Sequence, residues 1–154
     1  MDYQMLIAST NEGKIKEITN RLHSIEGLKI NIASLEDYPT IPEPDEPFNN
    51  LMENAIYKSK YYAVCINALT LSEDSGLFIE ALNGFPGVKT KDLIEECGGL
   101  SQAFSKLESL LSGHRDYTGY FSTAVALYIP SYDFLISHRA QALDGLIRNF
   151  QTKK

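Results

Sequence analysis

The chain has 154 residues, of which 44% are hydrophobic and 22% charged, and its formal charge at pH 7 is −6. This composition is typical of a globular domain that can bury a core, and the acidic balance argues against a general nucleic-acid binder, because such proteins must neutralise phosphates. Neither a membrane-spanning apolar stretch nor a leader peptide is recognised, and Cys65 and Cys97 lack metal-type spacing, so we expect a cytoplasmic protein with buried, reduced thiols.

The elements expected in the first half of the chain alternate between strand and helix. Residues 5–8 are an apolar run that predicts a buried strand, and residues 14–22 carry apolar side chains at helical spacing. A second strand is expected over residues 28–33. Four prolines in residues 39–47 exclude a helix and favour a stiff, extended loop. Apolar residues at helical spacing then predict a long helix over residues 51–66.

The second half continues the alternation. Its expected elements are, in chain order, a strand over residues 68–71, a turn-rich loop over 83–87, a helix over 100–111, a long strand over 117–129 and a C-terminal helix over 141–150. Alternating strands and helices predict an α/β fold, here with a mixed rather than purely parallel sheet.

Residues 9–14 lie between the first strand and the first helix and are suited to binding phosphate. Ser9, Thr10 and Asn11 are small and polar, and a helix N-terminus offers free N–H groups. Lys14 adds a full positive charge. The segment is not a Walker loop, whose glycine spacing it lacks. The simpler alternative is helix capping by Thr10 or Asn11, with Lys14 in solvent.

A set of acids follows in the chain. Asp45 and Glu46 end the proline-rich loop, Glu53 begins the long helix, and Glu73 and Asp74 lie at the expected end of a strand. Ligands gather at the carboxyl ends of strands in open α/β sheets, and carboxylates beside a phosphate site suggest Mg²⁺. The alternative is that these acids are solvated surface residues.

A third candidate is the sequence Ser137-His138-Arg139. Arginine makes bidentate or stacking contacts and histidine offers two distinct ring nitrogens, so the pair could bind the edge of a purine. The alternative is that both side chains cap a helix and stay exposed.

Four motifs in this order resemble the inosine triphosphate pyrophosphatase family (Ham1/RdgB-like), which hydrolyses non-standard purine nucleotides. They are residues 7–14, residues 53–55 with Lys58, residues 73–77 and residues 81–87. The resemblance extends from about residue 5 to about residue 129 and more weakly to the end.

The resemblance implies one domain over residues 1–154, built on an elongated mixed β-sheet flanked by helices, in two lobes around a cleft. It also implies a homodimer that hydrolyses ITP, XTP or dITP to the monophosphate and pyrophosphate with Mg²⁺, and no nucleic-acid or membrane partner.

The family's site residues transfer by motif. Ser9, Asn11 and Lys14 would bind the triphosphate, as Thr10 beside them would. Ser75 would contact the substrate, and Glu46 and Asp74 would hold the metal, with Asp74 also activating the attacking water. Glu53 would support the metal or the water network, and His138 and Arg139 are the remaining residues that could recognise the base.

The chain departs from the family in its last part. The glycine-rich aromatic loop that clasps the base is absent, as is the lysine before Ser137-His138-Arg139. Either this stretch is the family's C-terminal helix motif after an internal deletion, or it is the strand that precedes the missing loop.

Three functions are compatible with these observations. The leading one is an active nucleoside triphosphate pyrophosphatase. The alternative is a degenerate homologue that binds nucleotides or acts as a structural dimer without turnover. A related pyrophosphatase of the Maf-like type is a third option, which residues 9–11 do not favour.

Overall fold

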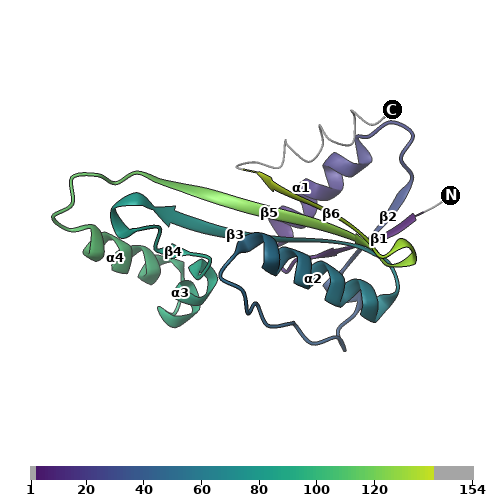
Figure 1. The fold of residues 1–154 in the computed structure, drawn as a ribbon, viewed down its shortest axis with the longest axis horizontal. Coiled ribbons are helices and arrows are strands. Elements are labelled where there is room, and N and C mark those ends of the chain that lie inside the picture. The colour runs from purple at the N-terminus through teal and green to yellow at the C-terminus, as the bar shows by residue number, and fades with distance from the viewer. Residues whose placement is uncertain (1–2, 141–154) are drawn as a thin grey trace.

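The computed structural model describes residues 3–140 and has one central β-sheet with helices on both faces (Figure 1). The strands are β1 (Tyr3–Ala8), β2 (Ile30–Ser34), β3 (Leu69–Ile79), β4 (Pro86–Gly87), β5 (Gly119–Ile129) and β6 (Phe134–Ala140). The α-helices are α1 (Glu12–His23), α2 (Leu51–Ile66), α3 (Thr90–Glu96) and α4 (Leu100–Leu111).

The sheet is mixed, as predicted. Its strand order is β2-β1-β3-β5-β6, with β4 paired to part of β3. Strand β1 runs parallel to β2 and β3, whereas β5 is antiparallel to both β3 and β6. The pairing of β3 with β5 continues from Thr70–Tyr128 to Ile79–Gly119, and this long ladder gives the molecule its elongated shape.

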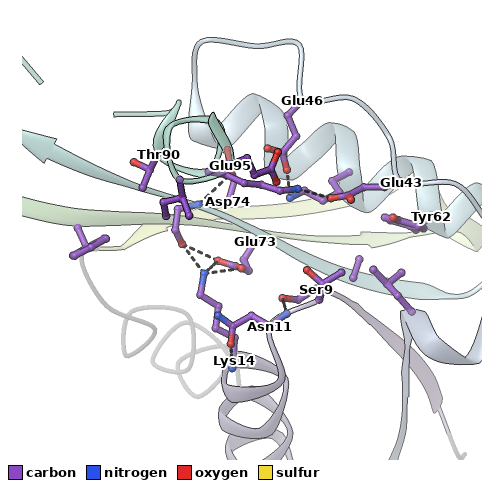
Figure 2. Close-up of a pocket in the computed structure, with 18 residues that line it drawn as sticks. Ser9, Asn11, Lys14, Glu43, Glu46, Tyr62, Glu73, Asp74, Thr90 and Glu95 are labelled. Atoms are coloured by element: carbon purple, nitrogen blue, oxygen red, sulfur yellow. Dashed lines mark hydrogen bonds and ion pairs between the residues drawn. The ribbon is translucent and has the colours of Figure 1, made fainter. Parts of the chain in front are cut away.

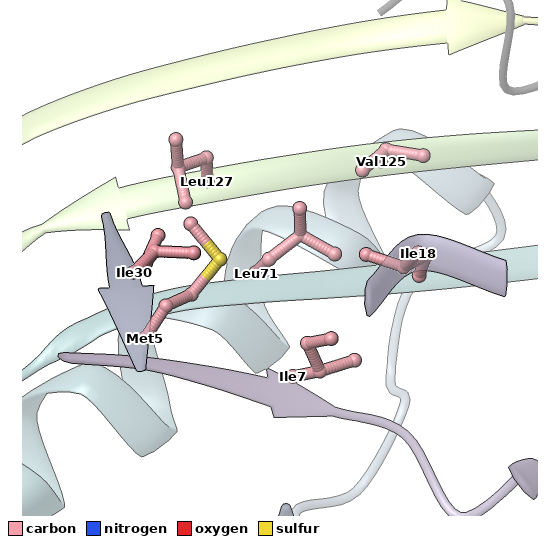
Figure 3. Close-up of a cluster of buried hydrophobic side chains, with 7 residues drawn as sticks. All are labelled: Met5, Ile7, Ile18, Ile30, Leu71, Val125 and Leu127. Atoms are coloured by element: carbon pink, nitrogen blue, oxygen red, sulfur yellow. The ribbon is translucent and has the colours of Figure 1, made fainter. Parts of the chain in front are cut away.

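Alternating residues of the strands supply two cores, because successive side chains in a strand point to opposite faces. On one face, Ile7, Leu71 and Val125 pack with Ile18 of α1 (Figure 3). The other face packs against α2 through small and aromatic side chains, which are Leu6, Ala8, Tyr62, Ala55, Ala124 and Ala126. The sheet is therefore covered on both faces around its centre.

Helices α3 and α4 pack at one end of the long strands, away from α1 and α2 (Figure 1). Their core contains Ile79, Leu93, Ala103 and Leu107. This small lobe and the larger lobe share β3 and β5. Within residues 3–140, no helix combines the length and the apolar character needed to cross a bilayer.

The helices predicted over residues 14–22, 51–66 and 100–111 are confirmed, with bounds that differ by two residues at most. The expected strand end after residue 71 is wrong, because β3 continues to Ile79. The prediction of buried thiols is wrong for Cys65, which is exposed on α2. The helix predicted over residues 141–150 lies outside the described residues.

Candidate active site

A cavity of about 460 Å³ lies where the two lobes meet (Figure 2). It is lined by the β1–α1 loop, the proline-rich loop, α2, β3 and α3. The polar side chains that line it are Ser9, Thr10, Asn11, Lys14, Glu43, Glu46, Lys58, Tyr62, Glu73, Asp74, Ser75, Thr90, Lys91 and Glu95. Segments that are distant in sequence thus contribute to one site.

The β1–α1 loop combines helix capping with a lysine that points into the cavity. Asn11 is the N-cap of α1, and its Oδ1 accepts a hydrogen bond of 3.1 Å from the backbone N–H of Lys14. The capping alternative is therefore right about Asn11. It is wrong about Lys14, whose Nζ lies 2.7 and 2.8 Å from the two carboxylate oxygens of Glu73 and 3.1 Å from Ser75 Oγ.

Two further lysines in the cavity are paired with acids of the proline-rich loop. Lys58 of α2 donates to Glu46, and both side chains are largely buried. Lys91 of α3 donates to Glu43 at 2.7 Å, and this hydrogen bond raises the pKa of Lys91. The two salt bridges attach the loop to both lobes. They also place two more positive charges in the cavity, at positions where phosphate oxygens could take over the pairing.

Asp74 is the buried acid of the cavity that has no lysine partner within residues 3–140. Its Oδ1 accepts from the backbone N–H of Ser75 at 3.0 Å, and its Oδ2 accepts from Asn54 Nδ2 at 3.1 Å. Burial, followed by repulsion from Glu46, raises the pKa of Asp74 from 3.8 to about 6. Its carboxylate thus titrates close to neutral pH, as a general base should.

The donor set suits a cation that arrives with phosphates. In the described part of the chain, no group of three or more histidine, cysteine, aspartate or glutamate side chains could hold a metal by itself. Mg²⁺ usually takes one or two protein carboxylates and completes its shell with water and substrate phosphates. The mutual repulsion of Asp74 and Glu46 is what such a cation would relieve, so the residues fit Mg²⁺ bound together with a nucleotide.

Of the residues predicted from the sequence, the structure brings Ser9, Thr10, Asn11, Lys14, Glu46, Asp74 and Ser75 to this cavity. It does not bring Asp45 or Glu53, which are both exposed and do not line it. Glu73, expected among the acids, is the partner of Lys14 rather than a free carboxylate.

His138 and Arg139 lie in β6, so the choice between helix and strand is decided for the strand. Their backbones pair with Val125 and Ala124 of β5. Because Ala124 pairs in turn with Asp74, Arg139 occupies the same row of the sheet as Asp74. The side chains of His138 and Arg139 lie outside the described part of the structure.

Sequence reasoning missed several side chains of the site. Asn54 contacts Asp74, Thr123 Oγ1 lies 2.8 Å from Ser75 Oγ, and Thr90 and Lys91 line the cavity. Asn54 and Lys58 lie four residues apart on the predicted helix, so their side chains share one face of it. This spacing was the signal from which both could have been identified as residues of the site. Thr123 carries no such signal, because only the β3–β5 register brings it to Ser75.

Comparison with known proteins points to one family. The model of the Ham1 family matches residues 5–147. A protein of Geobacter sulfurreducens named dITP/XTP pyrophosphatase is 33% identical over 82% of this chain and 63% of its own length. A protein of Exiguobacterium sp. with the same name is 35% identical over 83% of this chain and 64% of its own length. The chain thus spans somewhat less than two thirds of the length of these relatives.

Solved structures share the fold. A nucleoside-triphosphatase, dITP/XTP pyrophosphatase, from Mycobacterium abscessus superposes with a TM-score of 0.74 at 27% identity, over 89% of this chain and 71% of that one. A HAM1 protein from Coxiella burnetii superposes with the same TM-score at 25% identity, over 89% of this chain and 69% of its own. With a family model that covers almost every residue and a matching fold, the chain belongs to the Ham1 family.

Proposed function

We propose that this chain hydrolyses non-standard purine nucleoside triphosphates (dITP, XTP and ITP) to the monophosphate and pyrophosphate, with Mg²⁺. The observation that carries the proposal is Asp74, a buried carboxylate that has no lysine partner within residues 3–140, in a cavity that Lys14, Lys58 and Lys91 also line. The names of the similar proteins, dITP/XTP pyrophosphatase, support the substrate class.

The lysines form the part of the site that binds phosphate. Lys14, Lys58 and Lys91 come from three different helices and line one cavity. Figure 2 labels Lys14 together with Glu46 and Glu43, the partners of the other two lysines. A bound triphosphate would exchange their contacts with Glu73, Glu46 and Glu43 for contacts with phosphate oxygens. The free N–H groups at the start of α1, beside Ser9 and Asn11, add dipolar stabilisation.

Asp74 is the group that acts on the attacking water. In its ionised form it accepts a proton from water as the oxygen attacks the α-phosphorus, and the bond from that phosphorus to the bridging oxygen breaks, which releases pyrophosphate. Mg²⁺, when bound to Asp74 and Glu46, neutralises charge on the phosphates. Asn54 and the backbone of Ser75 hold the carboxylate in place.

The test is a pyrophosphate-release assay with dITP, XTP, ITP, ATP and GTP, with and without Mg²⁺. We expect release that requires Mg²⁺, and a loss of about 10²-fold or more in Asp74→Asn with an unchanged circular dichroism spectrum. Activity of Asp74→Asn within a few fold of wild type would contradict the role of Asp74. Nucleotide binding without release by the wild type would favour the alternative, a degenerate homologue.

The homodimer implied by the family resemblance and the cytoplasmic location expected from the sequence remain predictions. Light scattering on the purified 154-residue chain tests the first, with twice the mass of 17.2 kDa as the expected result.

A further inference from the structure

Asn54 is a buried amide whose hydrogen-bonding atoms face fixed partners. Its side chain is 1% exposed. Oδ1 accepts from the backbone N–H of Phe48 at 3.0 Å, and Nδ2 donates to the Phe48 carbonyl at 3.1 Å and to Asp74 Oδ2 at 3.1 Å. The orientation of the amide is determined, because the flipped form would direct N–H groups at the Phe48 N–H.

These contacts join two segments that carry acids. Phe48 directly follows the proline-rich loop, two residues after Glu46, and Asp74 belongs to β3. Lys58, one helical turn after Asn54, pairs with Glu46. Helix α2 therefore holds Asp74 with one side chain and the loop that presents Glu46 with two.

Helix α2 is itself fixed on the sheet, so it can set the distance between the two acids. Ala55 and Ser59 are fully buried. Ser72 of β3 donates from Oγ to the Ala55 carbonyl, next to Asn54. A change in the position of Asn54 would require α2 to slide against β3, which close packing resists.

We propose that Asn54 is a positioning residue that orients Asp74 and the Glu46 loop toward one shared cation. This inference rests on the proposed function and goes beyond it by assigning a role to an amide that touches neither the substrate nor the metal. Each Asp74 oxygen accepts one protein hydrogen bond and keeps a lone pair for a cation. Without Asn54, the Asp74 carboxylate loses the hydrogen bond at Oδ2 and keeps the one at Oδ1, and the loop loses both hydrogen bonds at the Phe48 backbone.

The experiment compares Asn54→Ala with the matched control Asn50→Ala. Asn50 is the N-cap of the same helix, and its Oδ1 accepts from the Met52 N–H, so its loss weakens α2 without touching Asp74. Mn²⁺ serves as the probe, and its affinity is measured by electron paramagnetic resonance with saturating α,β-imido-dITP, which cannot be hydrolysed at the scissile position.

We expect Asn54→Ala to bind Mn²⁺ about tenfold or more weakly, as is typical when a group that orients a metal ligand is removed. The Mg²⁺ concentration for half-maximal activity should rise by a similar factor, with kcat falling more than KM rises. Asn50→Ala should keep the wild-type values of both despite a lower melting temperature. An affinity for Mn²⁺ in Asn54→Ala within twofold of wild type, or no weaker than in Asn50→Ala, would overturn the proposal.

If Asn54→Ala does not fold, Asn54→Ser is used in the same comparison, because its hydroxyl keeps one polar contact in the buried site. The same Mn²⁺ criteria then decide. Failure of the proposed function has a different signature. The wild-type protein would then bind Mn²⁺ and the imido nucleotide but release no pyrophosphate from dITP.

Discussion

Asp74 is buried beside Glu46 and has no lysine partner within residues 3–140, so ionisation of its carboxylate should lower the stability of the fold. Its folded-state pKa of about 6 lies above the ordinary 3.8, so between these values the folded state binds more protons than the unfolded state. The stability that depends on a protonated Asp74 is fully present below about pH 4 and is lost as the pH rises through 6. Asp74→Asn lacks this dependence.

The corresponding prediction concerns the metal-free protein in EDTA. The free energy of unfolding of Asp74→Asn relative to wild type should increase from pH 4 to pH 7.5, by up to about 3 kcal/mol. Urea denaturation of both proteins at the two pH values measures it. A difference that stays constant with pH would mean that the Asp74 carboxylate is not destabilised in the fold.

In the proposed function Lys14 acts as a point charge on phosphate, so its removal should affect all nucleotides alike. In Lys14→Ala we expect KM to rise about 10- to 100-fold, as for the loss of one charge-assisted hydrogen bond, by the same factor for dITP and ATP. The cap of α1 should survive, because Asn11 bonds the backbone N–H of residue 14 and not its side chain. A loss confined to one base would show that Lys14 does not contact phosphate.

At the scale of elements, the close approach of β3 and β4 places α3 at the cavity. A Cβ on Gly76 would lie 2.3 Å from the Gly87 carbonyl oxygen, well inside contact distance. Thr90 Oγ1 donates to the same carbonyl and accepts from the Leu77 N–H. Gly76→Ala should therefore displace β4 and the start of α3, and with it Lys91.

We expect Gly76→Ala to lose about 1–3 kcal/mol of stability, as overpacking does, and to raise KM through the displaced Lys91. Thermal unfolding and dITP kinetics measure the two effects. Gly13→Ala is the control, because a Cβ there meets nothing closer than Asn11 Oδ1 at 3.3 Å, and alanine favours a helix over glycine. Equal stability of the two variants would contradict the steric argument.

The elements that the sequence predicts well are those whose periodicity is strong. Leu51, Ala55 and Tyr62 mark the buried face of α2, and all three are buried in the structure. The missed elements have weak local signals. Within residues 3–140, strand β6 pairs with β5 along one side only. Strand β3 continues through Glu73 and Asp74 because these acids line a polar cavity, although carboxylates and a glycine normally indicate a turn.

The candidate site is predictable to the extent that it lies in local motifs. The loop with Ser9 and Lys14 and the acid Asp74 were found from sequence and line the cavity. The pairing of each lysine with its acid could not be predicted from the sequence. Lys14 and Glu73 are 59 residues apart and Lys91 and Glu43 are 48 residues apart, so only the tertiary fold brings them together.

At the scale of the whole molecule, the cavity also has apolar lining beside the lysines and acids that both lobes contribute. Ile94 and Phe121 line its edge, and the Phe121 side chain is 62% exposed. The ring offers a flat surface for any purine, because stacking does not depend on the pattern of donors and acceptors on the base. The described part of the chain thus provides apolar contact area for a base.

These apolar contacts predict poor selectivity between bases in the 154-residue chain. A site that hydrogen-bonds its substrate rejects analogues strongly, whereas an apolar contact discriminates by much less. We expect kcat/KM for dITP or XTP to exceed that for ATP or GTP by roughly tenfold at most.

The measurement of kcat/KM for all four nucleotides includes a variant with His138→Ala and Arg139→Ala, since these two residues of β6 are the remaining candidates for base recognition. If a modest preference between bases disappears in the double variant, His138 and Arg139 are its source. Strong selectivity that survives both substitutions would place base recognition in side chains other than these and contradict the prediction.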